Sequence, residues 1–383
     1  MAVYKIFPYK DTTLYSMFPT MNTGIDPINQ ISNLNFAIDS QPSVARTLIK
    51  FDEDEINDVI TNTIGSTNYS TYLRSFIATA QGIVESSILE IWPVAVALDD
   101  TINWNQGTGT YLDQPLTTDG ACWESPFFAN SNAWPIGTRQ YVTGSFNTSY
   151  ASVGGGAWFT SSNGTDSMLV TASFGPRSDK DLNVNVDTIF QAWYSSSAIP
   201  NQGFILKWED NAEFNTSKMV QPVMQYYSVD TNTIYPPCLE FRWDDSSWVT
   251  GSSGIEVLDQ QNLYISLAEN PGIFYSQSLN RFRLNVRQKY PPRVYQTGSL
   301  YTVQHYLPSG SAWYAVKDLD TNEYVVGFDD NHTKISADTT SSYFDLYMNG
   351  FEPERYYKIL VKVTAAGSTT IYDDEYYFKI VNG

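Results

Sequence analysis

The sequence of 383 residues contains few of the residue types that supply cross-links, metal ligands and charged surfaces. It has 2 cysteines and 2 histidines, and charged residues make up 16% of the chain. Cys122 and Cys238 each lack a CxxC partner, which excludes a disulfide framework and a cysteine-rich zinc site. We expect two reduced, buried thiols, while a single bridge between them stays open as the alternative.

The scarcity of histidine restricts the catalytic chemistry of the chain. Neither His305 nor His332 has a second histidine at the i+4 spacing of a zinc-binding helix, and no GxSxG turn or GxxxxGK[ST] loop occurs. His332 follows two aspartates and is expected in a solvated turn. His305 alternates with Val303 and Leu307, as a strand residue would. We therefore expect no metal site, no cofactor and no catalytic residues.

Long apolar runs are absent, and positive charge is scarce. No stretch approaches the ~20 apolar residues of a membrane span, and residues 1–8 alternate instead of forming the apolar core of a signal peptide. The net charge of −19 comes from 41 acidic against 22 basic residues. Such a chain repels nucleic-acid phosphates and anionic lipid surfaces. We expect synthesis in a cytoplasm, no nucleic-acid binding and no membrane insertion.

Aromatic and β-forming residues, in contrast, are abundant. Aromatics reach 15% of the chain, with 27 Tyr and 20 Phe, a composition that favours strands. Alternation of apolar and polar residues predicts strands in both halves of the chain: Val3–Phe7, Arg46–Phe51, Val84–Trp92, Phe204–Trp208, Leu239–Trp243, Phe282–Val286, Tyr357–Val363 and Tyr376–Ile380. The sequence therefore predicts an all-β protein.

Two short helices are expected as additions to this β scaffold. The acidic run Asp52–Glu55 precedes apolar residues at helical spacing, which predicts a helix start. Asn68 is expected to cap a second helix, with Tyr72, Leu73 and Phe76 on its apolar face.

The length is typical of two or three domains, and Thr250–Gly254 (TGSSG) is the best linker candidate. We expect one domain over 1–250 and a second over 255–383. The second has evenly spaced strands separated by turn residues, which predicts an antiparallel, immunoglobulin-like β-sandwich.

Acidic residues offer two further interpretations. Glycosidases need only two carboxylates, and acidic pairs occur at Asp99/Asp100, Glu209/Asp210, Asp244/Asp245 and Asp373/Asp374. Most of these pairs flank predicted strand ends, where Asp favours turns. Asp318, Asp320 and Asn322 have the spacing of the first residues of a calcium loop but lack its glycine and final glutamate. A hairpin turn between two strands explains them more simply.

The loop-rich region from Thr101 to Gly164 carries large aromatics. Trp104, Trp123, Trp134 and Trp158 lie there among many Gly, Asn and Ser residues. Tryptophans in long loops either pack into a core or form platforms for protein partners and sugar rings. These four are the candidate interface or glycan-binding aromatics of the chain.

The N-terminal domain also has an order of short motifs that resembles a known family. The motifs are Lys10–Thr13, Met21–Gly24, Arg46–Asp52, Asn103–Trp104, Asn183–Asp187, Trp193, Asn201–Lys207 and Pro236–Phe241. Their order resembles the DNRLRE-type jelly-roll domain, a β-sandwich similar to some carbohydrate-binding modules. The segment Asp54–Gln81, expected to be helical, and the long loop Trp123–Trp158 depart from that pattern.

The whole chain resembles virion structural proteins of tailed marine phages of the cyanophage type. The residues that carry the resemblance are Phe7-Pro8, Lys10-Asp11, Pro19–Gly24, Lys334–Ser336, Tyr343-Phe344 and Glu354–Ile359. The resemblance implies a place in a virion, in the tail, neck, baseplate or fibre apparatus or on the head. The partners would then be other virion proteins and copies of the same chain.

These observations predict a jelly-roll-like domain followed by an immunoglobulin-like sandwich, and a structural virion component that acts by assembly and not as an enzyme. The first alternative is a glycan-binding module that recognises a host surface glycan. The second is a polysaccharide-degrading enzyme that uses one of the acidic pairs.

Overall fold

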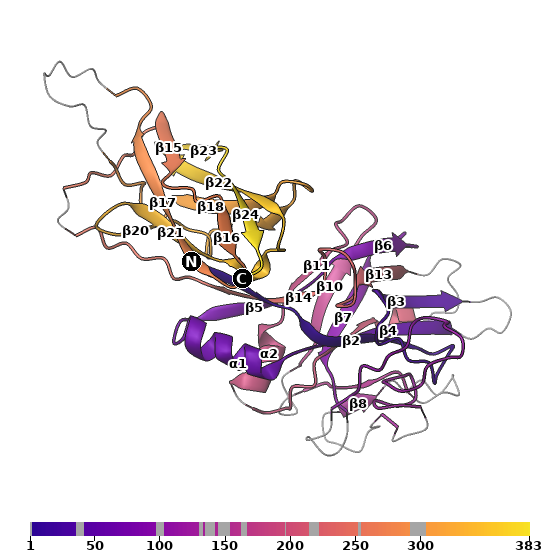
Figure 1. The fold of residues 1–383 in the computed structure, drawn as a ribbon. Helices are drawn as coiled ribbons and strands as arrows, with labels where there is room; N and C mark the ends of the chain where they lie inside the picture. The colour runs from indigo at the N-terminus through magenta and orange to yellow at the C-terminus, as the bar shows by residue number, and fades with distance from the viewer. Residues whose placement is uncertain are drawn as a thin grey trace, which may run out of the picture. The chain divides into compact units, whose positions relative to one another are not determined.

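The computed structural model describes residues 2–35, 42–96, 103–129, 133–134, 142–144, 154–161, 167–195, 197–213, 222–251, 254–291 and 304–383. Within these ranges the protein consists mainly of antiparallel β-sheets with a few short helices (Figure 1). The prediction of an all-β sandwich protein is therefore confirmed.

The chain forms two compact units. Unit 1 comprises Met1–Lys5, Ile64–Tyr69 and Phe241–Gly383, and unit 2 comprises Ile6–Thr63 and Ser70–Glu240. Unit 1 thus contains both the first and the last residues of the chain. The linker expected at Thr250–Gly254 stays a prediction, and residues 252–253 lie outside the described ranges.

Unit 2 is built on an eight-stranded sheet with the order β10-β7-β12-β4-β3-β13-β6, in which β2 also pairs with β4. These strands are β2 (Pro8–Tyr15), β3 (Ile28–Asn35), β4 (Pro42–Phe51), β6 (Ile77–Gln81), β7 (Ser87–Pro93), β10 (Val170–Phe174), β12 (Phe204–Trp208) and β13 (Val223–Tyr227). β12 lies between β7 and β4, and all five of its residues are buried. The jelly-roll assignment of this part stays a prediction.

The remaining elements between residues 2 and 243, some of which extend into unit 1, are short. They are β1 (Ala2–Ile6), β5 (Tyr69–Ser75), β8 (Val142–Gly144), β9 (Ala157–Phe159), β11 (Leu182–Asn185), β14 (Cys238–Trp243), α1 (Glu53–Asp58), the π-helix η1 (Val59–Ile64), α2 (Asp187–Tyr194) and α3 (Asp210–Glu213). The helix start at Asp52 is confirmed, because its carboxylate accepts hydrogen bonds from the backbone N–H groups of Asp54 and Glu55.

The prediction of a second helix after Asn68 is wrong. Residues capped by Asn68 form strand β5, in which Thr71, Leu73 and Ser75 are buried and alternate with less buried residues. The spacing of Tyr72, Leu73 and Phe76 also fits a helix, but pairing with β11 selects the period of two. The segment Asp54–Gln81 is therefore helical only in its first part.

Unit 1 is a β-sandwich of two sheets. The first has the order β15-β17-β21-β20, and the second has the order β16-β24-β22-β18-β19 with β23 on β22. The strands are β15 (Leu263–Leu267), β16 (Ile273–Tyr275), β17 (Leu279–Gln288), β18 (Ala312–Asp318), β19 (Tyr324–Val326), β20 (Ser336–Ala337), β21 (Ser342–Tyr347), β22 (Tyr356–Ala365), β23 (Ser368–Tyr372) and β24 (Tyr377–Val381), with the 3-10 turn η2 (Met348–Gly350). Apart from the β16–β24 pair, which is parallel, the pairs are antiparallel.

The core of unit 1 follows the predicted alternation. Phe282, Leu284 and Val286 of β17 are buried, whereas Arg283 and Asn285 point to the other side. Phe344 stacks between two of the core rings, with centroid distances of 4.2 Å to Tyr314 and 5.3 Å to Phe282. The order β15-β17-β21-β20 corresponds to the ABED layer of an immunoglobulin-type sandwich, and β24-β22-β18 within the second sheet corresponds to its GFC layer.

Candidate functional site

The four candidate tryptophans lie in the interior of unit 2. Trp104, Trp123, Trp134 and Trp158 are each at most 5% exposed. The Trp104 indole donates to the carbonyl of Gln202 at 2.9 Å, and the Trp134 indole donates to the carbonyl of Cys122 at 3.0 Å. As the chain is folded, none of the four presents a free ring face to a partner or a sugar. Three of the rings lie beside buried cationic side chains: Trp104 beside Lys10, and Trp123 and Trp158 beside Arg46.

A buried charge cluster is centred on Arg46 of β4. Its guanidinium donates twice to Glu213 of α3, at 2.7 Å from Nε and 2.6 Å from Nη2. The third donor, Nη1, reaches the carbonyl of Gly155 at 2.8 Å. Both side chains of the ion pair are fully buried. A buried guanidinium stabilises a fold only when its donors are satisfied, and here one carboxylate and one carbonyl do so.

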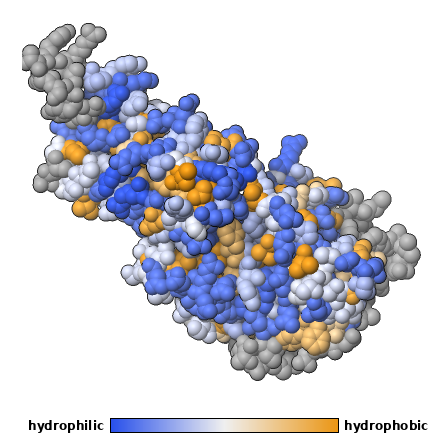
Figure 2. All heavy atoms as spheres, in the orientation of Figure 1, coloured by the Kyte–Doolittle hydropathy of each residue, from blue (hydrophilic) through white to orange (hydrophobic). Residues whose placement is uncertain are grey.

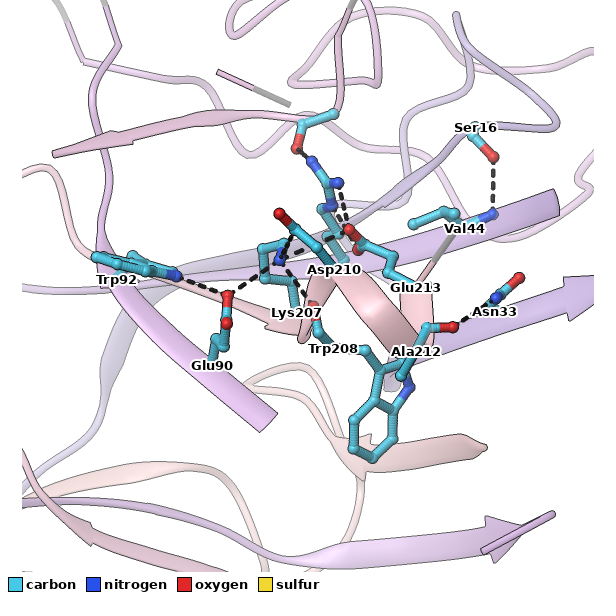
Figure 3. Close-up of polar contacts among 12 residues, drawn as sticks. Ser16, Asn33, Val44, Glu90, Trp92, Lys207, Trp208, Asp210, Ala212 and Glu213 are labelled. Carbon is cyan, nitrogen blue, oxygen red and sulfur yellow. Dashed lines mark hydrogen bonds and ion pairs between the residues drawn. The ribbon is translucent and has the colours of Figure 1, made fainter. Parts of the chain in front are cut away.

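Lys207 of β12 extends the cluster. Its ammonium lies 3.1 Å from Glu90, 2.9 Å from Asp210 and 3.7 Å from Glu213, and it donates to the carbonyl of Trp208 at 2.7 Å (Figure 3). Burial lowers the pKa of Lys207, but these carboxylates outweigh burial and the nearby Arg46, so its pKa is raised. The ammonium is therefore charged in the folded protein.

Two of the candidate tryptophans cover this cluster. The Arg46 guanidinium lies 5.1 Å from the ring centroid of Trp123 and 5.5 Å from that of Trp158. Gly155 completes the cover, because its φ is +79° and a Cβ there would lie 2.6 Å from the Trp123 ring. The Gly154–Gly156 run thus leads directly into strand β9, with all three glycines at positive φ.

The motif Met21–Gly24 forms a second buried polar centre. The Asn22 amide donates to the carbonyls of Gln106 (2.6 Å) and Ala121 (2.9 Å), and its oxygen accepts from the N–H groups of Gly24 (3.1 Å) and Gly109 (3.0 Å). One side chain therefore fixes three stretches of loop. The hydrogen bonds of Asn22 described here all go to backbone groups, so the motif Met21–Gly24 is explained by its structural role in holding these loops together.

The motif Lys10–Thr13 places two ionisable groups in the interior. Asp11 accepts from Asn29 Nδ2 and from the Val229 N–H, both at 2.8 Å, and burial raises its pKa to about 7. Lys10 donates to the carbonyl of Trp104, and burial, together with the charge of Lys50, lowers its pKa to about 7. Both side chains thus have a pKa of about 7, and both are enclosed by protein groups.

The exposed side of the larger sheet of unit 1 has a different character. Tyr377, Lys358, Lys317 and Tyr324 lie in register across β24, β22, β18 and β19. A second row pairs Ile273, Lys379 and Tyr356 across β16, β24 and β22. We call this surface the Tyr–Lys face; it comprises Ile273, Tyr275, Lys317, Tyr324, Tyr356, Lys358, Tyr377 and Lys379.

The apolar and aromatic members of the Tyr–Lys face are 41% to 60% exposed. Lys317 lies 4.4 Å from the ring centroid of Tyr324, and Lys379 lies 5.9 Å from that of Tyr356. Lys358 pairs with Asp373 at 2.7 Å. On the side of the molecule seen in Figure 2, the surface is mostly hydrophilic, with hydrophobic residues in small separate areas. The exposed contact groups of the Tyr–Lys face are mainly tyrosine rings with polar tips.

The described acidic pairs are used in ion pairs and turns. Asp210 contacts Lys207, Asp244 lies 3.1 Å from Lys334, and Asp373 contacts Lys358, while Asp99/Asp100 lie outside the described residues. Within the described ranges, no group of three or more His, Cys, Asp or Glu side chains could hold a metal ion.

The expected hairpin turn after β18 is confirmed. Asp318 forms a bidentate ion pair with Arg355, with both N–O distances at 2.7 Å, and accepts from the N–H groups of Asp320 and Thr321. The carboxylate oxygens of Asp318 are thus used by Arg355 and by the two backbone N–H groups. The hairpin turn, and not a calcium loop, explains the spacing of Asp318, Asp320 and Asn322.

The remaining expectations concern single residues. His332 lies in a turn, as predicted, 2.9 Å from Asp329. Cys122 and Cys238 are both buried and do not form a disulfide, so the expectation of two thiols is confirmed. Among the described residues, no helix is both long enough and apolar enough to cross a membrane.

Sequence reasoning missed the Arg46–Glu213–Lys207 cluster, whose members are distant in the chain, and the Tyr–Lys face. Alternation in β22 and β24 could have indicated the Tyr–Lys face, since it places Tyr and Lys on the side of the sheet opposite the core residues.

Comparison with protein-family models and with curated proteins finds no match to this chain.

Proposed function

We propose that the chain is a structural component of a phage virion that acts by binding neighbouring protein chains. Two observations support this proposal: the resemblance of its motifs to virion proteins, and an exposed aromatic face on a sandwich with a well-packed core. The polar centres of unit 2 are enclosed and paired, so they stabilise the fold and leave contacts to the surface.

The Tyr–Lys face is the observation on which the assembly role rests. Tyrosines are favoured anchors at protein interfaces, because they bury a large ring while keeping a hydrogen bond at the tip. Here Tyr275, Tyr356 and Tyr377 project from neighbouring strands of a sheet whose other side is the core. In this proposal Lys317, which lies over the Tyr324 ring, pairs with an acidic partner surface, and a second copy of this acidic chain also offers one. Lys358 and Lys379 keep their ion pairs with Asp373 and Glu354.

Immunogold labelling of purified particles, with an antibody to this chain, tests the virion role. Label at one fixed position supports the proposal and gives the location on head, neck or tail. Protein found only in the lysate, with no label on particles, would overturn it.

Lysine-specific cross-linking of the same particles tests the surface. Cross-links to other chains are expected from Lys317, Lys358 and Lys379, whereas Lys180 of unit 2 serves as the comparison. If intermolecular cross-links arise from Lys180 but from none of the three, the Tyr–Lys face is not the contact surface.

A further inference from the structure

Strand β17 lies between β15 and β21 in the first sheet of unit 1 (Figure 1) and is longer than both. β15 pairs with its residues 284–288 and β21 with its residues 279–284, so each end of β17 has a strand on one side only. Successive strand residues direct their N–H and C=O groups to opposite sides. The Arg283 carbonyl accepts from the Ala268 N–H at 2.8 Å, so the odd-numbered residues of β17 face the side of β15.

The end of β17 that extends beyond β21 is covered by another part of the chain. There the His305 N–H donates to the carbonyl of Val286 at 2.9 Å. Gln304 Nε2 donates to the carbonyl of Leu284 at 2.7 Å. Residues 304–305 thus take the place of β21 where that strand has ended.

The outer edges of the same sheet are covered as well. At β20, the Ala337 N–H donates to the carbonyl of Ser247 and the Ala337 carbonyl accepts from the Val249 N–H, both at 2.9 Å. At β15, the Leu267 N–H donates to the Asp374 carboxylate at 3.2 Å. Proteins protect sheet edges in such ways, because a row of unpaired main-chain groups pairs with other chains.

The end of β17 that extends beyond β15 is different. Leu279 and Arg281 direct their main-chain groups to the side of β15, and these groups have no hydrogen-bond partner within the described ranges. This end of the strand lies at the surface, since Leu279 is 53% exposed and the Arg281 side chain is 45% exposed. It is therefore an open edge in a sheet whose other edges are covered.

The chain that leaves β15 is held away from this open edge. It changes direction at Glu269, whose φ is +54°. The carbonyl of Glu269 accepts from the Tyr376 hydroxyl at 2.7 Å, and the carbonyl of Gly272 accepts from the Lys379 N–H at 2.9 Å. Because these bonds tie the segment to β24 and the residue before it, the gap beside β17 is formed before any partner arrives, which lowers the entropy lost on binding.

A pocket of about 360 Å³ lies at the same place. Pro271, Phe274 and Asn280 are among its walls; Pro271 is exposed, and the other two are half-buried. In a strand added beside β17, every second side chain would lie on the same side of the sheet as Asn280 and meet this pocket. The rings of Pro271 and Phe274 favour an apolar side chain there.

We propose that an extended segment of a partner protein adds to β17 at residues 279–283, antiparallel to it and in line with β15. Its main chain pairs with Leu279 and Arg281, and its inward side chains are apolar. Unpaired N–H and C=O groups at strand spacing select a polypeptide, since another main chain offers acceptors and donors at the same spacing. This edge is distinct from the Tyr–Lys face, and the proposal does not depend on a role in a virion.

Titration of the full chain with a synthetic peptide tests the proposal. The probe is a blocked five-residue peptide that alternates threonine and valine, with threonine at both ends. In the proposed register, the N–H groups of the threonines face β17 and those of the valines face solvent. We expect a Kd in the high micromolar to millimolar range, and the amide resonances of Leu279 and Arg281 should shift as the peptide binds.

Two N-methylated forms of the peptide are a matched pair. Methylation of the central threonine nitrogen removes an N–H that pairs with β17 and should weaken binding by at least about tenfold. Methylation of the first valine nitrogen, which faces solvent, should change the Kd by less than about twofold. Replacement of both valines by aspartate should also weaken binding by about tenfold, because the pocket has apolar rings and the exposed Glu269 carboxylate.

Two variants of Arg281 test the same edge from the protein side. Arg281→Pro removes the N–H on the open side, where a strand tolerates proline, and should weaken binding of the probe by at least about tenfold. Arg281→Ala loses the same side chain but keeps the N–H, and it should bind the probe as the unaltered chain does. Thermal unfolding establishes that both variants are folded, and the methylated peptides keep the test valid if Arg281→Pro is not.

The proposal is overturned if the threonine–valine peptide does not bind, if both N-methylated peptides bind equally well, or if folded Arg281→Pro binds as tightly as Arg281→Ala. It is also overturned if Arg281→Pro, but not Arg281→Ala, abolishes self-association in sedimentation velocity. A second copy of this chain would then occupy the edge.

Discussion

Arg46 and Glu213 are 167 residues apart in the sequence and form a fully buried bidentate ion pair. The pair joins β4 to α3, and the Gly155 carbonyl ties the turn before β9 to the same guanidinium. Three segments that share no local sequence pattern are therefore fixed by one side chain. Removal of one partner alone is expected to destabilise the fold strongly, because the other charge then stays buried without a counterion.

Glu213→Gln should strongly destabilise the protein. The substitution leaves the buried Arg46 without a countercharge and takes a carboxylate from Lys207, so we expect a loss of about 3 to 5 kcal/mol. Guanidinium-induced unfolding measures it. Asp210→Asn is the matched control, since Asp210 also contacts Lys207 but is 78% exposed, and its loss should stay below about 1 kcal/mol. Equal losses would show that burial is not the deciding factor.

Asp11→Asn should change how stability depends on pH. Folded Asp11 keeps its proton up to about pH 7, whereas the unfolded group releases it near 3.8. The folded state thus binds more protons in this window, so the contribution of Asp11 to stability falls as pH rises from 3.8 to about 7. Asparagine retains an acceptor for Asn29 and Val229 without the charge.

The variant should therefore gain stability over the unaltered chain with rising pH, by about 2 to 4 kcal/mol between acid and pH 8. Unfolding curves at several pH values measure the gain, with the exposed Asp113→Asn as control. Lys10 acts in the opposite direction and at higher pH: its folded pKa of about 7 lies below the ordinary 10.5, so the contribution of Lys10 to stability falls as pH falls from 10.5 to about 7. A constant difference between Asp11→Asn and the unaltered chain would contradict the assignment.

Gly107→Ala should disrupt the centre formed by Asn22. Gly107 has a φ of +81°, and an added Cβ would lie 2.2 Å from Asn22 Oδ1. Gly310 has a similar φ of +66° but no atom within 4 Å of an added Cβ. Gly310→Ala should thus cost about 1 kcal/mol for backbone conformation alone, and Gly107→Ala clearly more. Thermal unfolding compares the two, and similar losses would mean that the loop around Asn22 adapts.

Neither cysteine should react with Ellman's reagent in the folded protein. Both side chains are buried, and burial raises the pKa of Cys122, which disfavours its reactive thiolate. In guanidinium without reductant, both thiols should react. A protein in which neither reacts in denaturant would contain a bridge, contrary to the structure.

Tyr356→Ser combined with Tyr377→Ser should weaken association between chains while preserving the fold. Both rings are exposed, so their loss removes contact area from the Tyr–Lys face and little from the core. Sedimentation velocity at increasing concentration measures self-association. Tyr264→Ser is the control, because Tyr264 has the same 41% exposure as Tyr377 but lies on the other sheet, in β15. An equal effect of the control variant would remove the face from consideration.

Local patterns predicted much of the fold, but few of the long-range contacts. Alternation identifies Phe282–Val286 and Phe204–Trp208 correctly, because each pleat imposes a period of two on the buried residues. Helix α2 was not predicted, and β5 was taken for a helix, since short segments fit both periods and sheet pairing decides between them.

The buried tryptophans show the same limit at the candidate site. Trp123 lies in a loop and Trp158 in the three-residue strand β9, and neither belongs to a periodic pattern, so their sequence indicates large rings but not the direction in which they point. Their position depends on Arg46, whose burial in turn depends on Glu213. No local signal connects these residues.

The N-terminal residues determine when the protein is completed. Val3 packs on the core of unit 1, and the carbonyl of Lys5 accepts from Asn349 Nδ2, a residue 344 positions later. At a synthesis rate of ~5–20 residues per second, the first strand therefore waits roughly 20 to 70 s for this partner to be made. Unit 2, which is an insertion within unit 1, is synthesised during that time. The segment that holds Val3 and Lys5 is thus among the last to reach its final position.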